Sequence, residues 1–235
     1  MQWLLSLLFT AFLFANTFFY GFVILCAFAL PYRVRAALAR QWARVSLGAL
    51  HLLCGLDYVV EGREHIPAGN HLSMWRHSST WETLAQAIVF PPQAWVLKRE
   101  ILWIPLIGWA TKLMRPIAID RSAHATAVNQ VVAQGRERLA EGLWILIFPE
   151  GTRVGVGERR RFGISGALLA TQTGRLIVPV AHDAGRYWAR RGLLKKRGTI
   201  RLVIGPPIDP AGREPRVVNE EIKAWIDAKV AELGG

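Results

Sequence analysis

Hydrophobic residues dominate the start of the chain, and no charged side chain interrupts them over residues 1–32. A helix needs roughly 20 apolar residues to cross the hydrocarbon core of a bilayer, and this stretch is longer than that. A cleavable signal peptide would place Lys or Arg ahead of its apolar region, and none stands there. The pattern therefore predicts an N-terminal helix that attaches the chain to a membrane, either across the bilayer or within one leaflet.

Arginines and a second apolar stripe follow this stretch. Because Lys and Arg collect on the cytoplasmic side of membrane anchors, Arg33 and Arg35 predict that the rest of the chain faces the cytoplasm. Over residues 36–56 the apolar stripe consists of Trp42, Val45, Leu50 and Leu53, with Arg40 and Arg44 outside it. This pattern is typical of a helix that lies among lipid headgroups. The alternative is that the segment packs on the domain that follows.

From about residue 57, short β-branched runs alternate with helical stretches. The predicted strands are 57–62, 94–99, 115–120, 144–149, 176–181 and 199–205. The predicted helices lie near 80–90, 104–113, 122–141, 163–173 and 216–232. Near-continuous apolar strands suit a sheet covered on both faces, and alternation with helices favours parallel strands. We predict an α/β fold with a mainly parallel or mixed sheet flanked by helices, divided into a membrane-associated segment, 1–56, and one α/β domain, 57–235.

Charge and composition narrow the class of partner. Lys and Arg outnumber Asp and Glu by 29 to 17, and the net charge of +12 favours anionic partners such as nucleic acid, acidic lipids or phosphorylated small molecules. A hydrophobic fraction of 52% and ten Trp residues favour a membrane over nucleic acid, and no nucleotide-binding glycine loop is present. Cys26 and Cys54 have no Cys or His at metal-ligand spacing, so the sequence supports neither a disulfide framework nor a metal site.

The segment GNHLSMWRHSSTWETLAQ, residues 69–86, contains a histidine with an acid five residues later. A neutral imidazole takes a proton from an alcohol best when a carboxylate holds its other N–H group. Residues five apart do not share a helix face, so His77 and Glu82 can meet only if His77 lies in the turn before a helix and Glu82 in its first turn. The alternative is that Glu82 only caps this helix through the Ser79 amide, at capping-box spacing.

A second polar cluster follows the apolar strand in WILIFPEGTRVG, residues 144–155. In a mainly parallel sheet, ligands bind at the carboxyl ends of the strands. Gly151 lets backbone N–H groups approach an anion, Thr152 offers a hydroxyl, and Arg153 can bind a phosphate through two N–H groups. Lys98 ends another predicted strand and is a candidate second arm of this anion site. The alternative is an ordinary turn with solvent-exposed basic side chains.

Four blocks in this order resemble the 1-acylglycerol-3-phosphate acyltransferase family, within the wider glycerolipid acyltransferases. The blocks are RHSSTWET, LKREILWIPLIGW leading into PIAIDR, FPEGTR, and IVPVAHDAG. They span most of the predicted α/β domain, and FPEGTR after a His-x4-acid block is a specific combination. The chain departs from the common pattern because Glu82 stands where Asp is usual, and HSSTWET looks like a bacterial variant. NHLS at 70–73 resembles the start of the commoner block, but Arg76 occupies its acid position, so His77 and not His71 is the predicted base.

The resemblance implies transfer of an acyl group from a thioester of coenzyme A or acyl carrier protein to the sn-2 hydroxyl of lysophosphatidic acid, which forms phosphatidic acid. It implies no metal, no cofactor besides the acyl donor, and no covalent acyl-enzyme. Because substrate and product stay in the bilayer, we expect the protein at the cytoplasmic face of a bacterial inner membrane. The alternatives are transfer to another lysolipid and a catalytically inactive relative that binds lipid.

By the same resemblance, His77 is the expected general base and Glu82 its orienting partner. The expected substrate-binding residues are Glu150, Gly151, Thr152, Arg153, Lys98 and Pro179. Arg153, with Gly151 and Thr152, would bind the glycerol phosphate, while Glu150 would hold their loop. Lys98 would add positive charge, and Pro179 would shape the acyl-donor side. Backbone N–H groups after His77 are candidate donors to the oxyanion of the reaction.

Overall fold

The computed structural model describes residues 1–120 and 124–234, with the backbone alone for His124 and Ala125. The strands are β1 (Leu56–Glu61), β2 (Leu72–Trp75), β3 (Gln93–Lys98), β4 (Ile117–Ile119), β5 (Trp144–Ile147), β6 (Ile177–His182) and β7 (Gly198–Ile204). The α-helices are α1 (Gln2–Cys26), α2 (Tyr32–Cys54), α3 (Trp81–Val89), α4 (Ile107–Leu113), α5 (His124–Ala140), α6 (Ser165–Thr173), α7 (Ala184–Tyr187) and α8 (Pro215–Glu232). Two 3₁₀ turns are η1 (Arg63–His65) and η2 (Arg99–Trp103).

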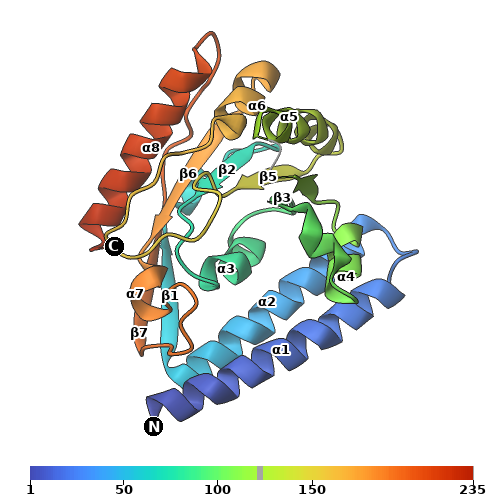
Figure 1. The fold of residues 1–235 in the computed structure, drawn as a ribbon, viewed down its shortest axis with the longest axis vertical. Coiled ribbons are helices and arrows are strands. Elements are labelled where there is room, and N and C mark those ends of the chain that lie inside the picture. The colour runs from blue at the N-terminus through green and yellow to red at the C-terminus, as the bar shows by residue number, and fades with distance from the viewer. Residues whose placement is uncertain (121–123, 235) are drawn as a thin grey trace.

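The described strands form one sheet in the order β1-β7-β6-β2-β5-β3-β4 (Figure 1). Neighbours from β6 to β4 pair in parallel, β7 is antiparallel to β6, and β1 is parallel to β7. The predicted α/β fold with a mixed, mainly parallel sheet is therefore confirmed. Each of the six predicted strands corresponds to a strand of this sheet, and every predicted end lies within two residues of the observed one.

The strand β2 was absent from the sequence prediction, although it lies in the middle of the sheet between β6 and β5. All four of its residues are buried, so it shows no alternation of polar and apolar positions that could have revealed it. The polar Ser73 is satisfied because its hydroxyl donates to Oε1 of Gln93 at 2.8 Å. A short central strand of this kind is defined by its two neighbours rather than by its own pattern.

Alternate residues of the strands contribute to two hydrophobic cores, one on each face of the sheet. In β5, Trp144 and Leu146 belong to the core under α1, α2 and α3, whereas Ile145 and Ile147 belong to the core under α5, α6 and α8. The helices thus form a layer on each side of the sheet (Figure 1). This burial on both faces explains why WILI reads as a continuous apolar run.

The helices α1 and α2 form an antiparallel pair that lies against α3 (Figure 1). The apolar stripe of α2 faces this packing, with Leu50 fully buried and the Trp42 indole donating to the Thr17 hydroxyl at 3.1 Å. Outside the stripe, Arg40 donates to the carbonyls of Ala87 and Phe90 at the end of α3. The apolar stripe of 36–56 is therefore turned toward protein, which favours the packing alternative over a helix that lies among headgroups.

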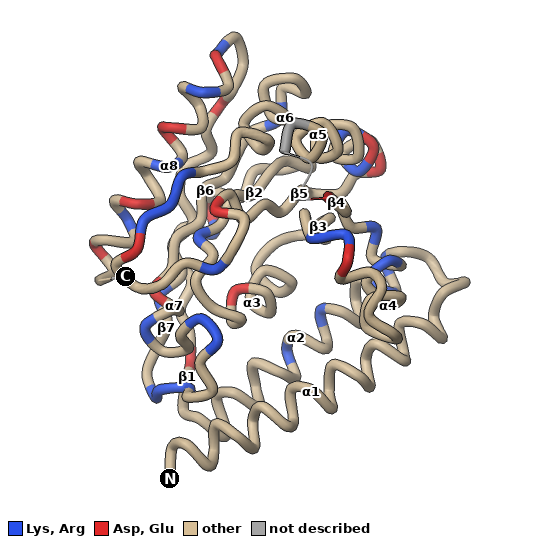
Figure 2. Tube along the Cα trace, in the orientation of Figure 1, with Lys and Arg blue, Asp and Glu red and all other residues tan. Residues whose placement is uncertain are grey.

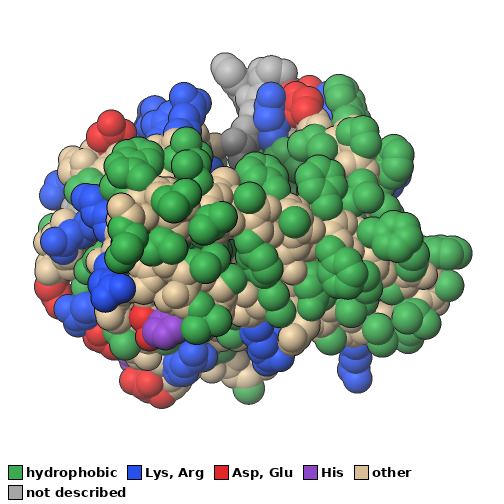
Figure 3. Space-filling model, turned by 90° about the horizontal axis from the view of Figure 1, so that it is seen from below, with side chains coloured by type: hydrophobic (Ala, Val, Ile, Leu, Met, Phe, Trp, Pro, Cys, Tyr) green, Lys and Arg blue, Asp and Glu red, His purple; other side chains and the backbone are tan. Residues whose placement is uncertain are grey.

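The helix α1 is the one described helix that is long and apolar enough to cross a membrane, with a mean hydropathy of 1.9 in its most apolar window. Its outer face exposes large side chains, namely Trp3, Leu4, Leu7, Leu8, Phe14, Phe18, Phe19 and Phe22. Seen from below in Figure 3, hydrophobic side chains gather across this face, and Lys and Arg lie at its margins. An exposed apolar surface of this extent marks a contact with a membrane or another apolar partner.

The segment that follows β3, made of η2 and α4, extends the exposed apolar surface of α1 near the end of that helix. The helix α4 begins three residues later than predicted, because Leu106 lies in a tight turn with a positive φ of 63° and packs against Gly21 of α1. This arrangement leaves Trp103, Ile104 and Trp109 exposed beside α1.

Candidate functional site

The candidate residues converge because the strands that precede them are parallel neighbours. His77 follows β2, the loop of residues 148–155 follows β5, and Lys98 is the last residue of β3. Parallel strands bring their carboxyl ends to the same edge of the sheet, which is where ligands bind in such folds. The backbone joins the first two segments directly, since the Val154 N–H donates to the His77 carbonyl at 2.7 Å.

His77 and Glu82 are hydrogen-bonded, with 2.8 Å between Nδ1 and Oε1. His77 lies in the turn before α3 and Glu82 in the first turn of that helix, which is the arrangement that the spacing required. An ionised carboxylate only accepts hydrogen bonds, so Nδ1 carries the proton and Nε2 is left as the basic atom of the neutral ring. The pair has the orientation of a general base and its supporting acid.

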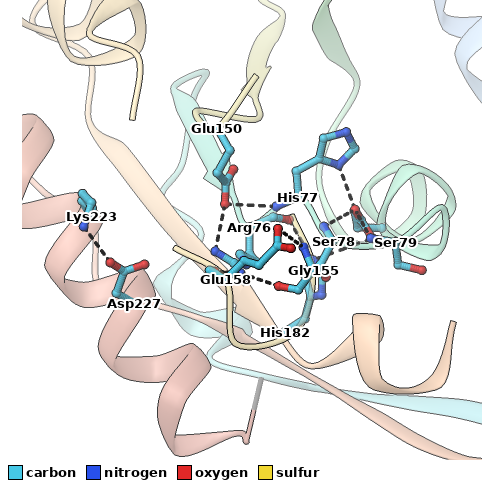
Figure 4. Close-up of polar contacts among 11 residues, drawn as sticks. Arg76, His77, Ser78, Ser79, Glu150, Gly155, Glu158, His182, Lys223 and Asp227 are labelled. Carbon is cyan, nitrogen blue, oxygen red and sulfur yellow. Dashed lines mark hydrogen bonds and ion pairs between the residues drawn. The ribbon is translucent and has the colours of Figure 1, made fainter. Parts of the chain in front are cut away.

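The same oxygen of Glu82 accepts two backbone hydrogen bonds, from Ser78 N at 2.9 Å and Ser79 N at 2.8 Å (Figure 4). Burial alone would raise the pKa of Glu82, but the hydrogen bond from His77, the nearby His182 and the Ser79 amide together hold it below its usual value. Glu82 therefore caps the helix and also orients His77. The two interpretations of the five-residue spacing, a catalytic pair and a helix cap, both hold. The Ser78 and Ser79 N–H groups are already bonded to this carboxylate, which corrects the expectation that they serve as oxyanion donors.

The imidazole of His77 is held from a second side by Phe148. The two rings are stacked, with centroids 4.0 Å apart and planes at 19°. The His77 side chain is 15% exposed, so the ring is fixed by its neighbours yet remains accessible. Phe148 begins the FPEGTR block, and the sequence carried no sign that its ring would lie against the histidine.

Arg76, which precedes the histidine, is a site residue that sequence reasoning missed. Its buried guanidinium donates to the carbonyls of Glu158 at 2.7 Å and Gly155 at 3.4 Å, and it lies 3.5 Å from the Glu150 carboxylate (Figure 4). Arg76, the neighbour of His77 in the sequence, thereby holds the loop after β5 at three points, Glu150, Gly155 and Glu158. The available signal was an arginine in an otherwise apolar strand end, since a buried Arg requires several partners.

Glu150 points into the protein rather than toward the open face of the site. Its Oε1 accepts the His77 N–H at 3.4 Å and faces Arg76, while Oε2 has no hydrogen-bond partner among the described residues. Burial raises the pKa of this carboxyl to about 7. The geometry fits the expected role of holding the loop and does not place Glu150 against a substrate.

Gly151, Thr152 and Arg153 form the open part of the loop. Gly151 has a φ of 68°, a left-handed conformation that favours glycine, and a Cβ there would meet no atom within 4 Å. Arg153 makes no ion pair within residues 1–120 and 124–234, and its Nε has no hydrogen-bond partner there although it is buried. An unpaired guanidinium one residue from the Val154–His77 hydrogen bond is suited to bind an anion beside the base.

Two of the expected substrate-binding residues, Lys98 and Pro179, have no hydrogen bond or ion pair among the described residues that links them directly to His77 or to the loop of Arg153. The Lys98 ammonium is half-exposed and lies 3.3 Å from the Glu100 carboxylate. Exposed ion pairs of this kind are weak, so Lys98 can exchange partners. Pro179 is buried inside β6, where it pairs in register with Met74 of β2. It can therefore influence the site only through the shape of the strand.

Two other histidines near these motifs, His182 and His71, have structural environments. His182 ends β6, is fully buried, donates through Nε2 to the Arg76 carbonyl at 2.9 Å and lies 3.9 Å from Oε2 of Glu82. Burial lowers its pKa, and its hydrogen bond to the Arg76 carbonyl supports the turn that carries His77. His71 lies at the opposite end of β2, with its ring nitrogens bonded to Ala68 O and Leu176 N. Within the described residues, no three His, Cys, Asp or Glu side chains form a metal-binding cluster.

Comparison with known proteins agrees with this geometry. The Acyltransferase family model matches residues 57–183. A 1-acyl-sn-glycerol-3-phosphate acyltransferase from Pseudomonas aeruginosa is 40% identical over 97% of this chain and 91% of that protein. One of the same name from Limnanthes alba is 26% identical over 91% of this chain and 76% of that protein. The crystal structure of a 1-acyl-sn-glycerophosphate (LPA) acyltransferase from Thermotoga maritima has the same fold, with a TM-score of 0.81 and 23% identity over 99% of this chain and 95% of that chain. The chain is an acyltransferase and belongs to the 1-acyl-sn-glycerol-3-phosphate acyltransferase family.

Proposed function

We propose that the protein transfers an acyl group from an acyl thioester to the sn-2 hydroxyl of 1-acylglycerol-3-phosphate, forming phosphatidic acid. The observation that carries this proposal is the hydrogen-bonded pair of His77 and Glu82 beside the unpaired guanidinium of Arg153. The base His77 is hydrogen-bonded to the loop that carries the anion site, and this arrangement suits an acceptor with both a hydroxyl and a phosphate. The names of the relatives support the same acceptor.

In this mechanism Nε2 of His77 accepts the proton of the sn-2 hydroxyl while the oxygen attacks the thioester carbonyl carbon. Glu82 stabilises the imidazolium that forms, because its ionised carboxylate accepts the Nδ1 hydrogen bond. The tetrahedral intermediate then expels the thiolate, the C–S bond breaks, and the sulfur takes the proton from Nε2. Direct attack by the alcohol requires no metal and no cofactor besides the donor.

Arg153 would bind the acceptor phosphate, because a guanidinium can donate two parallel hydrogen bonds to phosphate oxygens. Thr152 adds a hydroxyl, and Lys98, at the end of the strand next to β5, adds positive charge at the same edge of the sheet. The buried contacts of Arg76 with the loop keep this anion site at a constant distance from His77. Binding energy from the phosphate is thereby used to position the hydroxyl.

We place the protein at the cytoplasmic face of a bacterial inner membrane, attached through α1 and the exposed residues of η2 and α4. Both surfaces are apolar and adjacent, and Trp103 and Trp109 are the residue type that collects at the interface between lipid and water. The +12 net charge favours the acidic headgroups of that leaflet. The lipid acceptor could then reach His77 without leaving the membrane.

Transfer by the purified protein to lysophosphatidic acid in lipid vesicles tests the function. We expect activity with this acceptor from acyl-coenzyme A or acyl carrier protein, and lower activity with lysolipids that lack a terminal phosphate. His77→Ala should abolish transfer, whereas His71→Ala is a matched control that should keep most of it. Binding of lysophosphatidic acid without transfer from either donor would instead indicate an inactive lipid-binding relative, and a preference for another lysolipid would change the acceptor.

A further inference from the structure

A cavity of about 630 Å³ lies between the segment that joins α7 to β7 and the beginning of α1, and Val156 of the loop after β5 forms part of its wall. Its lining includes Trp3, Val156, Arg186, Lys196 and Arg197. This volume falls in the range of cavities that bind small ligands. The proposed reaction leaves this cavity without a role.

The cavity is strongly basic. Its lining contains three basic side chains and no acidic one, and two more arginines, Arg190 and Arg191, stand on the same segment. Within the part of the chain that the structure describes, none of these five takes part in an ion pair, and Arg186 donates one hydrogen bond, to the Leu233 carbonyl. Lys and Arg are concentrated along this segment near α7 and β7 in Figure 2. Among the described residues, three cations that form no ion pair line this concave surface and two more stand on the same segment, which favours an anionic ligand with several charges.

The segment that carries these side chains is fixed to the protein. Lys195 is 1% exposed, and its ammonium donates to the carbonyls of Leu193 at 2.8 Å and Ser6 at 3.4 Å and to the Thr10 hydroxyl. The Gln2 amide donates in turn to the Lys195 carbonyl at 2.6 Å. These contacts pin the backbone of the segment to α1, so the positions from which Lys196 and Arg197 project are fixed before a ligand binds.

The cavity adjoins the catalytic turn. Gly185 lines it, and a Cβ on Gly185 would lie 3.1 Å from the Ser78 hydroxyl oxygen and 3.4 Å from Val156. Ser78 is the residue after His77, and Val156 belongs to the loop after β5. A long molecule bound in the cavity could therefore extend toward the turn that carries His77.

We infer that this cavity binds the phosphorylated adenosine end of an acyl-coenzyme A donor. This inference rests on the proposed function, which requires a thioester near His77. The donor carries a diphosphate and a 3′-phosphate that match the cations in the lining of the cavity. A concave site of this size suits a small polyanion better than the acidic surface of a carrier protein.

Titration calorimetry of the full chain in detergent micelles with adenosine 3′,5′-bisphosphate tests the site without turnover. We expect the wild-type protein to bind this probe, and Lys196→Ala/Arg197→Ala to weaken binding by about tenfold or more. A matched control is Arg63→Ala/Arg216→Ala, which removes the same charge from exposed positions outside the cavity and should leave binding unchanged. Absence of wild-type binding, or equal loss in both double variants, would overturn the inference.

Steady-state kinetics distinguish three possible ligands of this basic segment: coenzyme A, acyl carrier protein and lipid headgroups. Lys196→Ala/Arg197→Ala should raise KM for acyl-coenzyme A by about tenfold, with kcat and KM for lysophosphatidic acid unchanged, and the effect should shrink with a dephospho-coenzyme A thioester. An increase confined to acyl carrier protein would assign the segment to that partner, and a loss of vesicle binding with a higher acceptor KM would assign it to headgroups. Either result overturns the inference while the proposed function stands. Bisphosphate binding at this segment in a protein without transferase activity would support the site and refute only the proposed function.

Discussion

The imidazole of His77 lies flat against the phenyl ring of Phe148, with ring centroids 4.0 Å apart. The contact joins the residue that is proposed to move the proton to the first residue of the loop that is proposed to bind the phosphate. Together with the 2.8 Å hydrogen bond to Glu82, it limits the ring to one orientation. The base and the anion site are therefore parts of one packed unit, and this relationship leads to the first prediction.

Replacing Phe148 with Leu should lower kcat by about tenfold while KM for the acceptor changes little, because stacked aromatic contacts contribute about 0.5–1.5 kcal/mol beyond their buried area. Phe148→Tyr keeps the ring and is the matched control. Steady-state kinetics in micelles provide the measurement. Equal kcat for the wild type and Phe148→Leu would show that Glu82 alone orients the imidazole.

Glu82 orients His77, and the Ser79 hydroxyl helps to cap the same end of α3, so two variants separate catalysis from helix capping. Glu82→Gln removes the charge that stabilises the imidazolium, so kcat should fall by about 10²–10⁴-fold. Ser79→Ala removes the hydroxyl that accepts the Trp81 N–H at 3.2 Å, which should cost about 1 kcal/mol of stability and leave kcat near the wild-type value. Thermal unfolding and kinetics of both variants test this, and a large fall in kcat for Ser79→Ala would contradict the separation.

The Glu150 carboxyl should make stability depend on pH. Burial raises its pKa to about 7 from an ordinary value of 4.5, so the folded protein binds more protons than the unfolded chain between these values. Its contribution to the free energy of unfolding therefore decreases as pH rises, by up to about 1.4 kcal/mol per pH unit. The wild-type Tm should fall relative to that of Glu150→Gln between about pH 5 and pH 7. A constant difference in Tm across this range would mean that Glu150 does not titrate there.

Arg153→Ala should raise KM for lysophosphatidic acid by roughly ten- to hundredfold with a smaller effect on kcat, because charge-assisted hydrogen bonds contribute about 1.5–3 kcal/mol. Arg99→Ala is the matched control, since Arg99 is exposed and already lies 2.9 Å from the Asp120 carboxylate. Its KM should change less than about twofold, as expected for a surface ion pair. Equal effects of both substitutions would show that Arg153 contributes only to the overall positive charge and does not bind the phosphate specifically.

Trp103 and Trp109 should enter the lipid interface, because they are 67% and 55% exposed beside the apolar face of α1. Brominated lipids in vesicles should quench tryptophan fluorescence, and Trp103→Ala/Trp109→Ala should lose a large part of the quenched signal. Trp225→Phe, on α8 at the other face of the sheet, is the control that should lose none of it. Unchanged quenching in the double variant would leave α1 as the membrane contact.

Local patterns in the sequence predicted much of the molecule. A mostly apolar run without a charged side chain defines α1, and alternation of β-branched runs with helical stretches defines the α/β class, because both signals come from neighbouring residues. The pairing of His77 with Glu82 was also predictable, since a turn followed by a helix brings residues five apart together. The four blocks identified the family for the same reason, as each is a short contiguous motif.

Only the tertiary structure determined how separate segments meet. The strand β2 carries no pattern of its own, and its place between β6 and β5 depends on partners far along the chain. The stripe of α2 has the same composition whether it faces lipid or protein, so packing alone assigned it to α1 and the sheet. Arg76 and Phe148 became site residues through contacts with residues more than 70 positions away. Periodicity describes one segment at a time, whereas these contacts follow from the order and direction of the strands.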